Sequence, residues 1–340
     1  MSISLKPLKN LVEAVKQVFT QHPPLPPERT LRLNVRDDDI CVLTFDRPGS
    51  SANIFDLRTL DELAEELEFV ARQSKLKGLI FISAKPSIFI AGADLKMMRE
   101  DIPPADVRML IERGQLVMNR IAALPIPTVA AIHGAAVGGG YELCLACDYR
   151  VASPDRSTKI GLPETKIGLL PAWGGSTRLP RLIGLPKALD IILGGKTVPA
   201  KHALRLGMVD EVVPVEHLIE AAVRKIHAGK PARPGHWLAN NPLISKIIAV
   251  RARREVLRKT RGNYPAVLKA LKVVTRGIVR PVEQSLALER EEFLELARTK
   301  ACHNLLRLFF LQERARKLKL PADGGDKTAP RPATHAAVIG

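Results

Sequence analysis

Residues 126–153 read IPTVAAIHGAAVGGGYELCLACDYRVAS, and this stretch decides the fold class. The apolar run Pro127–Ile132 predicts a buried strand, the glycine-rich turn after it predicts a helix start, and Tyr149–Ala152 predicts a second strand. This interpretation places Gly139 at a helix N-terminus, where backbone N–H groups lack partners and the dipole favours negative charge. Glu142 follows three residues later and therefore shares a helix face with Gly139.

Outward from this stretch, strands and helices alternate between about Asp38 and Asp210. Such alternation predicts an α/β fold. A doubly wound dinucleotide-binding fold is not favoured, because G-x-G-x-x-G is missing after the first strand. Past Glu216 the pattern becomes entirely helical, with apolar residues at a spacing of about 3.6. The strand-like runs are 40–45, 76–83, 127–134 and 148–153, and the helical segments are 57–73, 104–123, 243–260, 264–279, 281–300 and 301–320.

Composition is that of a globular protein, with 46% hydrophobic and 26% charged residues in a 340-residue chain. No apolar run approaches the ~20 residues that a membrane span needs. Leu5–Phe19 is a basic amphipathic segment. We interpret it as a surface helix or a frayed leader in preference to a segment with a targeting or membrane role. The four cysteines do not suggest a disulfide framework. We interpret Cys144 and Cys147 as small buried hydrophobic residues and not as ligands of a metal site. We therefore expect a cytoplasmic protein without a bound metal.

The net charge of +17 is concentrated in residues 221–280, which hold 15 Lys/Arg and one acid, Glu255. Three interpretations remain open: a solvated helical face, attraction of an anionic ligand, partner or membrane surface, and nucleic-acid binding. Nucleic-acid binding is disfavoured as the main function, because aromatic residues are only 4% and no recognition motif is present.

The glycine-rich stretch and four further blocks resemble the crotonase (enoyl-CoA hydratase/isomerase) superfamily. FDRPGSSANIFD (45–56) is similar to the family's first CoA-contacting turn, and FIAGADLKMM (89–98) to its first oxyanion loop. LPETKIGLLPAWGGSTRLPRLIG (162–184) resembles the second-carboxylate block, and AKHALRLGMVDEVV (200–213) the closing helix and strand. Several ordered motifs at family spacing are far more specific than one glycine motif. The resemblance implies a spiral of ββα turns followed by an all-helical C-terminal region.

This resemblance also implies roles for particular residues. Backbone N–H groups of Ala93 and Gly139 would form an oxyanion hole for a thioester enolate. Glu142 and Glu164 match the family's two catalytic glutamates, which would handle one water and its protons. Further substrate-binding positions are expected at Asn53, Gly92, Asp94, Lys96, Gly138, Ala172 and Trp173.

Two of these positions depart from the commonest family pattern. Many relatives have Gly-Ala where this chain has Ala172-Trp173, and a bulky Trp173 could narrow the acyl pocket, although core packing is the favoured interpretation. His133 is expected to be a hydrogen-bonded core residue.

The favoured function is hydration of 2-trans-enoyl-CoA to 3-hydroxyacyl-CoA in fatty-acid β-oxidation. The alternatives are Δ3-Δ2-enoyl-CoA isomerisation, which needs one carboxylate, and a non-catalytic crotonase-fold interaction protein. Acyl-CoA is the expected substrate, and no permanently bound cofactor is expected. A homo-oligomer or a thiolase-type partner subunit is expected, and peripheral membrane contact is compatible with the charge.

The C-terminal third contains RGNYPAVLKALKVV (261–274), ALEREEFLELARTK (287–300) and NLLRLFFLQERARK (304–317). These segments resemble the linker of multifunctional fatty-acid oxidation proteins, in which a hydratase half precedes a 3-hydroxyacyl-CoA dehydrogenase half. The expected organisation is an extension (1–37), a crotonase core (38–230), a helical linker region (231–320) and a flexible tail (321–340). The final HAAVIG resembles the first strand of a dinucleotide-binding domain. The resemblance implies that the rest of this domain, the dehydrogenase half, is missing from the chain, so we expect no NAD binding by it.

Overall fold

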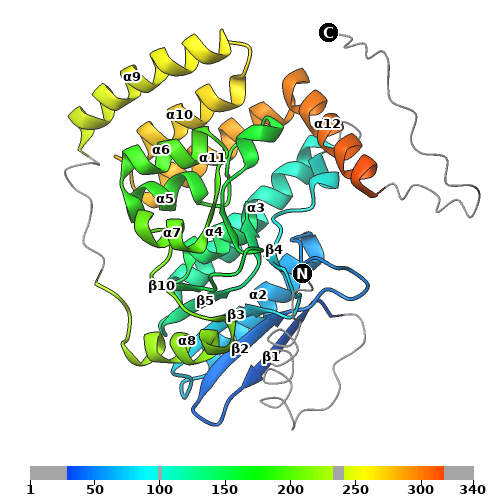
Figure 1. The fold of residues 1–340 in the computed structure, drawn as a ribbon, viewed down its shortest axis with the longest axis vertical. Helices are drawn as coiled ribbons and strands as arrows, with labels where there is room; N and C mark the ends of the chain where they lie inside the picture. The colour runs from blue at the N-terminus through cyan, green and yellow to red at the C-terminus, as the bar shows by residue number, and fades with distance from the viewer. Residues whose placement is uncertain (1–28, 99–101, 233–240, 318–340) are drawn as a thin grey trace, which may run out of the picture.

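A computed structural model describes residues 29–98, 102–232 and 241–317 of the protein (Figure 1). Within these residues, a six-stranded sheet has the order β1-β2-β3-β5-β7-β10, and a four-stranded sheet has the order β4-β6-β8-β9. In the large sheet β1 is antiparallel to β2 and the other neighbours are parallel. The strands are β1 (Leu31–Val35), β2 (Ile40–Phe45), β3 (Gly78–Ser83), β4 (Ile88–Ile90), β5 (Thr128–Ile132), β6 (Ala135–Val137), β7 (Tyr149–Ala152), β8 (Lys159–Gly161), β9 (Thr197–Pro199) and β10 (Glu211–Val212).

Helices cover both faces of the large sheet and continue beyond it. The first group is α2 (Leu57–Arg72), η1 (Leu95–Met98), α3 (Pro104–Ala123), α4 (Gly139–Ala146), η2 (Glu164–Ile167), α5 (Gly175–Ile183), α6 (Leu185–Leu193), α7 (Ala200–Leu206), η3 (Val215–His217) and α8 (Leu218–His227). The C-terminal group is α9 (Pro242–Thr260), α10 (Pro265–Gly277), α11 (Val282–Ala297) and α12 (Lys300–Lys317). The predicted α/β part and helical C-terminal region are therefore confirmed.

Two hydrophobic clusters lie on opposite faces of the large sheet, because alternate side chains of a strand point to opposite sides. In β2, Ile40 and Val42 belong to the smaller cluster, which α8 covers, whereas Cys41 and Leu43 belong to the main core. All six β2 residues are buried, as expected for a strand covered on both faces. This burial explains why the run was recognisable from its continuous hydrophobicity.

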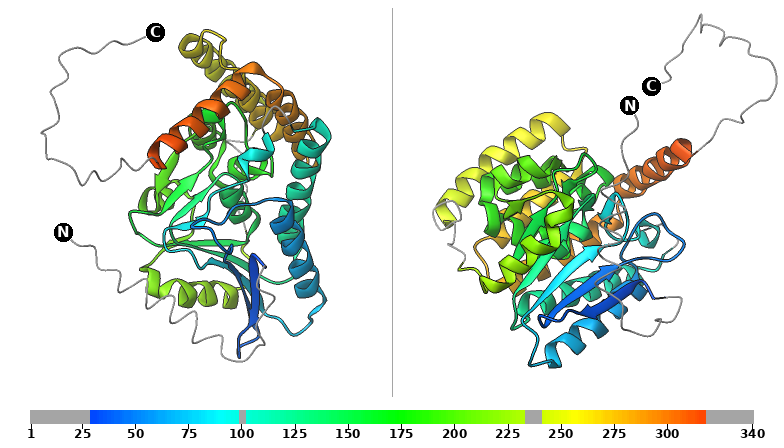
Figure 2. Two further views of the ribbon diagram at one scale, coloured as in Figure 1. Left: turned by 90° about the vertical axis from the view of Figure 1, so that its right-hand side faces the viewer. Right: turned by 60° about the horizontal axis from the view of Figure 1, so that its bottom comes forward.

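The C-terminal helices pack on the side of the core away from α8 (Figure 2, left). Helix α10 contacts α5 and α6, α11 contacts α3 and α5, and α12 contacts η2. Helix α9 packs on α10 and leaves large side chains exposed, including Leu243, Ile247 and Val250. None of the helices in the described ranges is long and apolar enough to cross a membrane.

Strands β1 and β5 refine the boundaries that the sequence predicts. Strand β1 lies within the extension 1–37, which is expected to end in a strand start, and it pairs with β2 over five residues. Strand β5 begins at Thr128, one residue later than predicted, because the ring of Pro127 leaves no N–H for a ladder. The segments 1–28, 233–240 and 318–340, which include Leu5–Phe19 and the predicted tail, lie outside the described residues.

Candidate active site

The turn between β6 and α4 builds one wall of the site. Gly138 has φ of 57° and precedes the helix, and its carbonyl accepts hydrogen bonds from the N–H groups of Tyr141 (2.8 Å) and Glu142 (2.9 Å). A side chain at Gly140 would collide with the backbone, since its Cβ would lie 2.2 Å from the carbonyl oxygen of Ile90. The glycines thus let α4 approach β4 closely and start the helix at Gly139, as the sequence predicts.

The two expected oxyanion donors lie on adjacent loops. Ala93 follows Gly92, whose carbonyl accepts the Phe55 N–H, and the next N–H, that of Asp94, donates to the Phe55 carbonyl. Among the described residues, no backbone hydrogen bond uses the N–H of Ala93 or Gly139. A Cβ built on Gly92 would lie 3.7 Å from the Gly139 nitrogen, so the two loops are in contact. Both donors also line one pocket, which makes them available to a shared ligand oxygen.

Glu142 is buried and held through one oxygen. Its Oε1 accepts hydrogen bonds from the N–H groups of Trp173 (2.8 Å) and Gly175 (2.7 Å). Burial raises the pKa of Glu142 to about 7, against the opposing effects of these N–H groups and the Arg178 charge. A carboxyl group with this pKa can exchange protons near neutral pH.

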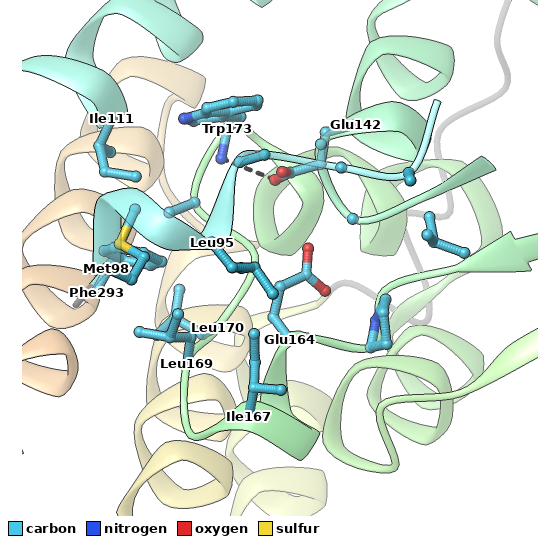
Figure 3. Close-up of a pocket in the computed structure, with 18 residues that line it drawn as sticks. Leu95, Met98, Ile111, Glu142, Glu164, Ile167, Leu169, Leu170, Trp173 and Phe293 are labelled. Carbon is cyan, nitrogen blue, oxygen red and sulfur yellow. Dashed lines mark hydrogen bonds between the residues drawn. The ribbon is translucent and has the colours of Figure 1, made fainter. Parts of the chain in front are cut away.

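Glu164 faces Glu142 across the pocket (Figure 3). It begins η2, and its Oε2 is buried without a hydrogen-bond partner in the described structure. Burial raises the pKa of Glu164 well above its usual range, and the negative charges of Glu142 and Glu289 act in the same direction. At neutral pH the pair can therefore hold one ionised carboxylate at Glu142 and one protonated carboxyl at Glu164.

The rest of the pocket is apolar and encloses about 100 Å³. Trp173 lines it and is 2% exposed, with its ring 5.6 Å from that of Phe55 in an edge-on arrangement. Side chains at Gly114 or Gly139 would collide with this indole, so it fills a tight space. Trp173 therefore serves both core packing and the pocket wall. The other large hydrophobic side chains that line the pocket include Leu95, Met98, Ile111, Ile167, Leu169, Leu170 and Phe293.

The structure brings most of the expected site residues to this pocket and leaves three away from it. Lining it are Gly92, Ala93, Gly138, Gly139, Glu142, Glu164, Ala172 and Trp173. Asp94 instead accepts the Lys96 N–H, which orders the turn into η1, and Lys96 is exposed. Neither side chain belongs to the pocket lining.

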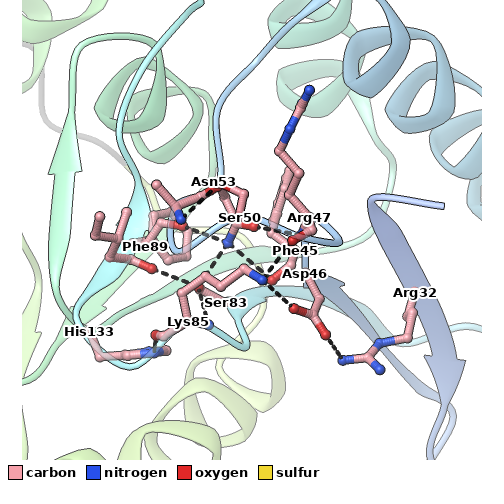
Figure 4. A network of polar contacts seen from close by, with 12 residues as sticks. Arg32, Phe45, Asp46, Arg47, Ser50, Asn53, Ser83, Lys85, Phe89 and His133 are labelled. Atoms are coloured by element: carbon pink, nitrogen blue, oxygen red, sulfur yellow. Dashed lines mark hydrogen bonds and ion pairs between the residues drawn. The ribbon is translucent and has the colours of Figure 1, made fainter. Parts of the chain in front are cut away.

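The side chain of Asn53 has a structural role (Figure 4). Its buried side-chain amide donates to Phe45 O (3.1 Å), Ser83 Oγ (2.9 Å) and Phe89 O (3.2 Å), and its Oδ1 accepts the Arg47 N–H. These contacts use the polar atoms of the side chain and tie β2, β3 and β4 together. The side chain of Asn53 is therefore engaged within the fold, and a substrate contact at position 53 stays a prediction for the backbone of this turn.

Nearby, His133 is buried, and its Nε2 lies 2.9 Å from the Lys85 carbonyl. Burial lowers the pKa of this imidazole. His133 is therefore a core residue with a hydrogen bond, as expected.

The sequence predictions missed the apolar pocket wall and two residues of α11. Phe293 lines the pocket. Glu289 is fully buried outside the pocket lining, and its Oε2 accepts the Gly174 N–H at 2.9 Å. The sequence carried a usable signal, because Leu286, Glu289 and Phe293 share one helix face at the i, i+3, i+7 spacing. An acid on an otherwise apolar face points to a buried polar role.

The model of the enoyl-CoA hydratase/isomerase family matches residues 36–236. This chain belongs to the enoyl-CoA hydratase/isomerase family. A fatty acid oxidation complex subunit alpha from Shewanella sp. (strain MR-4) is 39% identical over 320 residues, which cover 92% of this chain and 45% of the relative. This family member thus spans about half the length of the curated relatives it matches.

Solved structures of family enzymes have the same fold. An enoyl-CoA hydratase from Bacillus anthracis is 29% identical with a TM-score of 0.56, over 85% of this chain and 97% of that one. Human mitochondrial Δ3-Δ2-enoyl-CoA isomerase is 24% identical with a TM-score of 0.64, over 85% of this chain and 100% of that one, which speaks to the fold alone. The crotonase-type fold expected for this hydratase/isomerase family chain is confirmed.

Proposed function

We propose that this chain hydrates 2-trans-enoyl-CoA to 3-hydroxyacyl-CoA. The observation that carries the proposal is the pair of pocket carboxylates with different environments. Glu142 is held by two N–H groups through one oxygen, and Glu164 has a buried, unpartnered oxygen. A base and an acid at one apolar pocket are what the addition of water across a conjugated double bond requires.

In the proposed reaction, ionised Glu142 takes a proton from water as the water oxygen bonds to the β-carbon. The electron pair of the double bond moves to the thioester, and the resulting enolate oxygen accepts hydrogen bonds from Ala93 and Gly139. Protonated Glu164 then delivers a proton to the α-carbon. One proton must afterwards return from Glu142 to Glu164, so the carboxyls end in their starting states and one water is consumed.

Two alternatives compete with hydration. Isomerisation of a 3-enoyl-CoA needs only one carboxylate, and the presence of Glu142 and Glu164 in one pocket favours the two-proton reaction. A non-catalytic interaction protein would gain nothing from these acids, because burying carboxyl groups is costly. We regard acyl-CoA as the substrate, and a thiolase-type subunit or further copies of the chain as partners. The chain itself is expected not to bind NAD, and calorimetric titration with NAD tests that expectation.

The test is the loss of enoyl-thioester absorbance with crotonyl-CoA and with a long-chain 2-enoyl-CoA. The wild type should hydrate at least one of them, and Glu142→Gln and Glu164→Gln should each lower kcat by about 10²- to 10⁴-fold. The better substrate sets the chain-length preference. Absence of hydration with both substrates, alongside conversion of a 3-enoyl-CoA, would favour the isomerase instead.

A further inference from the structure

Glu289 of α11 is a third buried carboxyl group, next to the two that line the pocket. Its side chain is 0% exposed, and α11 lies outside the part of the chain that the family model matches. Oε2 accepts the Gly174 N–H at 2.9 Å, whereas Oε1 has no partner among the described residues. A buried carboxyl in this state is costly, which calls for a functional explanation.

The loop that Glu289 contacts is the one that holds Glu142. Three successive N–H groups of this loop alternate between the two acids. Those of Trp173 and Gly175 donate to Glu142, and that of Gly174 donates to Glu289. The loop is thus fixed from two sides, by α4 and by α11.

Arg178 closes the loop from a third direction. It donates to the Trp173 carbonyl at 3.0 Å and to Asn119 Oδ1 at 2.6 Å. Gly174 has φ of 109°, and a Cβ there would lie 1.7 Å from Arg178 Nη1, so the loop leaves no room for a side chain. The conformation of Trp173–Gly175 therefore depends on Glu142 and Glu289 as acceptors and on Arg178 as a donor.

We propose that Glu289 is a positioning residue for hydration: it anchors Gly174 so that the flanking N–H groups hold Glu142, and once ionised at alkaline pH its charge helps to keep the proton on Glu164. This inference rests on the proposed function. It also makes the helical C-terminal region part of the catalytic unit, because the residues matched by the family model contain no substitute for the α11 contact within the described structure.

The charged groups around Glu289 give the direction of the electrostatic effect. Glu142 and Glu164 lie on the pocket side, and Arg178 and Arg181 lie on α5. Burial raises the pKa of Glu289 to about 8, and the Glu142 charge adds to this, against the opposing effects of the Thr177 side chain, the Arg178 charge and the Gly174 N–H. Glu289 is therefore ionised mainly at alkaline pH. Repulsion between acids is mutual, so ionised Glu289 raises the pKa of Glu164. Removing its charge should lower the pH at which Glu164 loses its proton.

Two substitutions separate anchoring from charge. Glu289→Gln keeps an oxygen acceptor for Gly174 but removes the charge, so kcat at the optimum should stay within about fivefold while the alkaline limb of the kcat–pH profile moves to lower pH. Glu289→Leu removes the acceptor as well, so kcat should fall on the order of tenfold or more with little change in KM. Recovery of most of that loss in the Gln variant would identify the acceptor as the cause.

Glu292→Gln is the matched control, because Glu292 lies on the same helix and pairs with Lys269 (2.6 Å) and Lys272 away from the pocket. This variant should keep the wild-type pH profile. An unchanged profile in Glu289→Gln, or wild-type kcat in Glu289→Leu, would overturn the inference. So would equal kcat losses in Glu289→Leu and Glu292→Gln.

Hydrogen exchange of peptides covering Trp173–Gly175 provides a readout that does not need activity. Exchange should speed up in Glu289→Leu and stay near wild type in Glu289→Gln and Glu292→Gln. Unchanged exchange in Glu289→Leu would refute the anchoring role even if the wild type proved inactive. An inactive wild type with the expected exchange pattern would refute the proposed hydration while keeping the structural role.

Discussion

Replacing Glu142 by glutamine should stabilise the fold while it lowers kcat, and the stabilisation should depend on pH. The folded state raises the pKa of Glu142 from its ordinary 4.5 to about 7. Folded protein therefore binds this proton more tightly than unfolded protein does. The stability that this proton contributes is fully present below the pKa of Glu142 in the unfolded state. It is lost as pH rises through the pKa of Glu142 in the folded state. Glutamine has no proton to lose and escapes this penalty.

The size of the effect follows from the same shift. The difference between 4.5 and about 7 corresponds to a ceiling of about 3 kcal/mol, reached well above the folded value. Between pH 5 and pH 8.5, the stability of Glu142→Gln relative to wild type should rise by on the order of 2 kcal/mol. In a chain of this length, each kcal/mol of added stability raises Tm by roughly 2 °C.

Differential scanning fluorimetry of both proteins at about pH 5 and pH 8.5 measures this change. Glu292→Gln serves as a control in which the change in stability has the opposite sign. Burial alone would raise the pKa of Glu292, but its ion pairs with Lys269 and Lys272 outweigh burial and lower the pKa below its usual range. That variant should be less stable than wild type at both pH values. A Tm difference between Glu142→Gln and wild type that is independent of pH, or that falls with pH, would refute the electrostatic reasoning.

Two further substitutions test the pocket wall. In Gly139→Ala the new Cβ would lie 2.5 Å from Cζ3 of Trp173, so either the start of the helix or the indole ring must move. Because this movement displaces one oxyanion donor, kcat measured with crotonyl-CoA should fall by about 10²-fold. An unchanged kcat would show that Gly139 is not an oxyanion donor. Trp173→Phe should widen the pocket and raise kcat/KM for a long-chain 2-enoyl-CoA relative to crotonyl-CoA, and an unaltered ratio would mean that Trp173 does not limit acyl length.

The parts of the site that the sequence predicted are those whose chemistry is local. Gly138, Gly139 and Glu142 lie within five residues, so a turn followed by a helix start fixes their geometry with little help from distant contacts. Glu164 was identified from the resemblance to the family's second-carboxylate block, and its apolar surroundings favoured that role over a salt bridge. The buried strand β2 was found from continuous hydrophobicity alone.

What the sequence did not predict depends on long-range contacts. Glu289 reaches the Gly174 loop from 115 positions along the chain, and local periodicity cannot say which loop a helix face will meet. Asn53 was assigned to substrate because its neighbours resemble a CoA-contacting turn. Its amide instead joins three strands, a pairing that is visible only once the strands are assembled.

The central claim is that Glu142 and Glu164 act as one unit on one water. The most direct test is a double-variant cycle of kcat for 2-enoyl-CoA hydration with Glu142→Gln, Glu164→Gln and the combined variant. Groups that act as a unit are strongly non-additive, so the combined variant should be scarcely slower than either single one. Losses that multiply in the combined variant, or a Glu164→Gln enzyme that hydrates at the wild-type rate, would contradict the account.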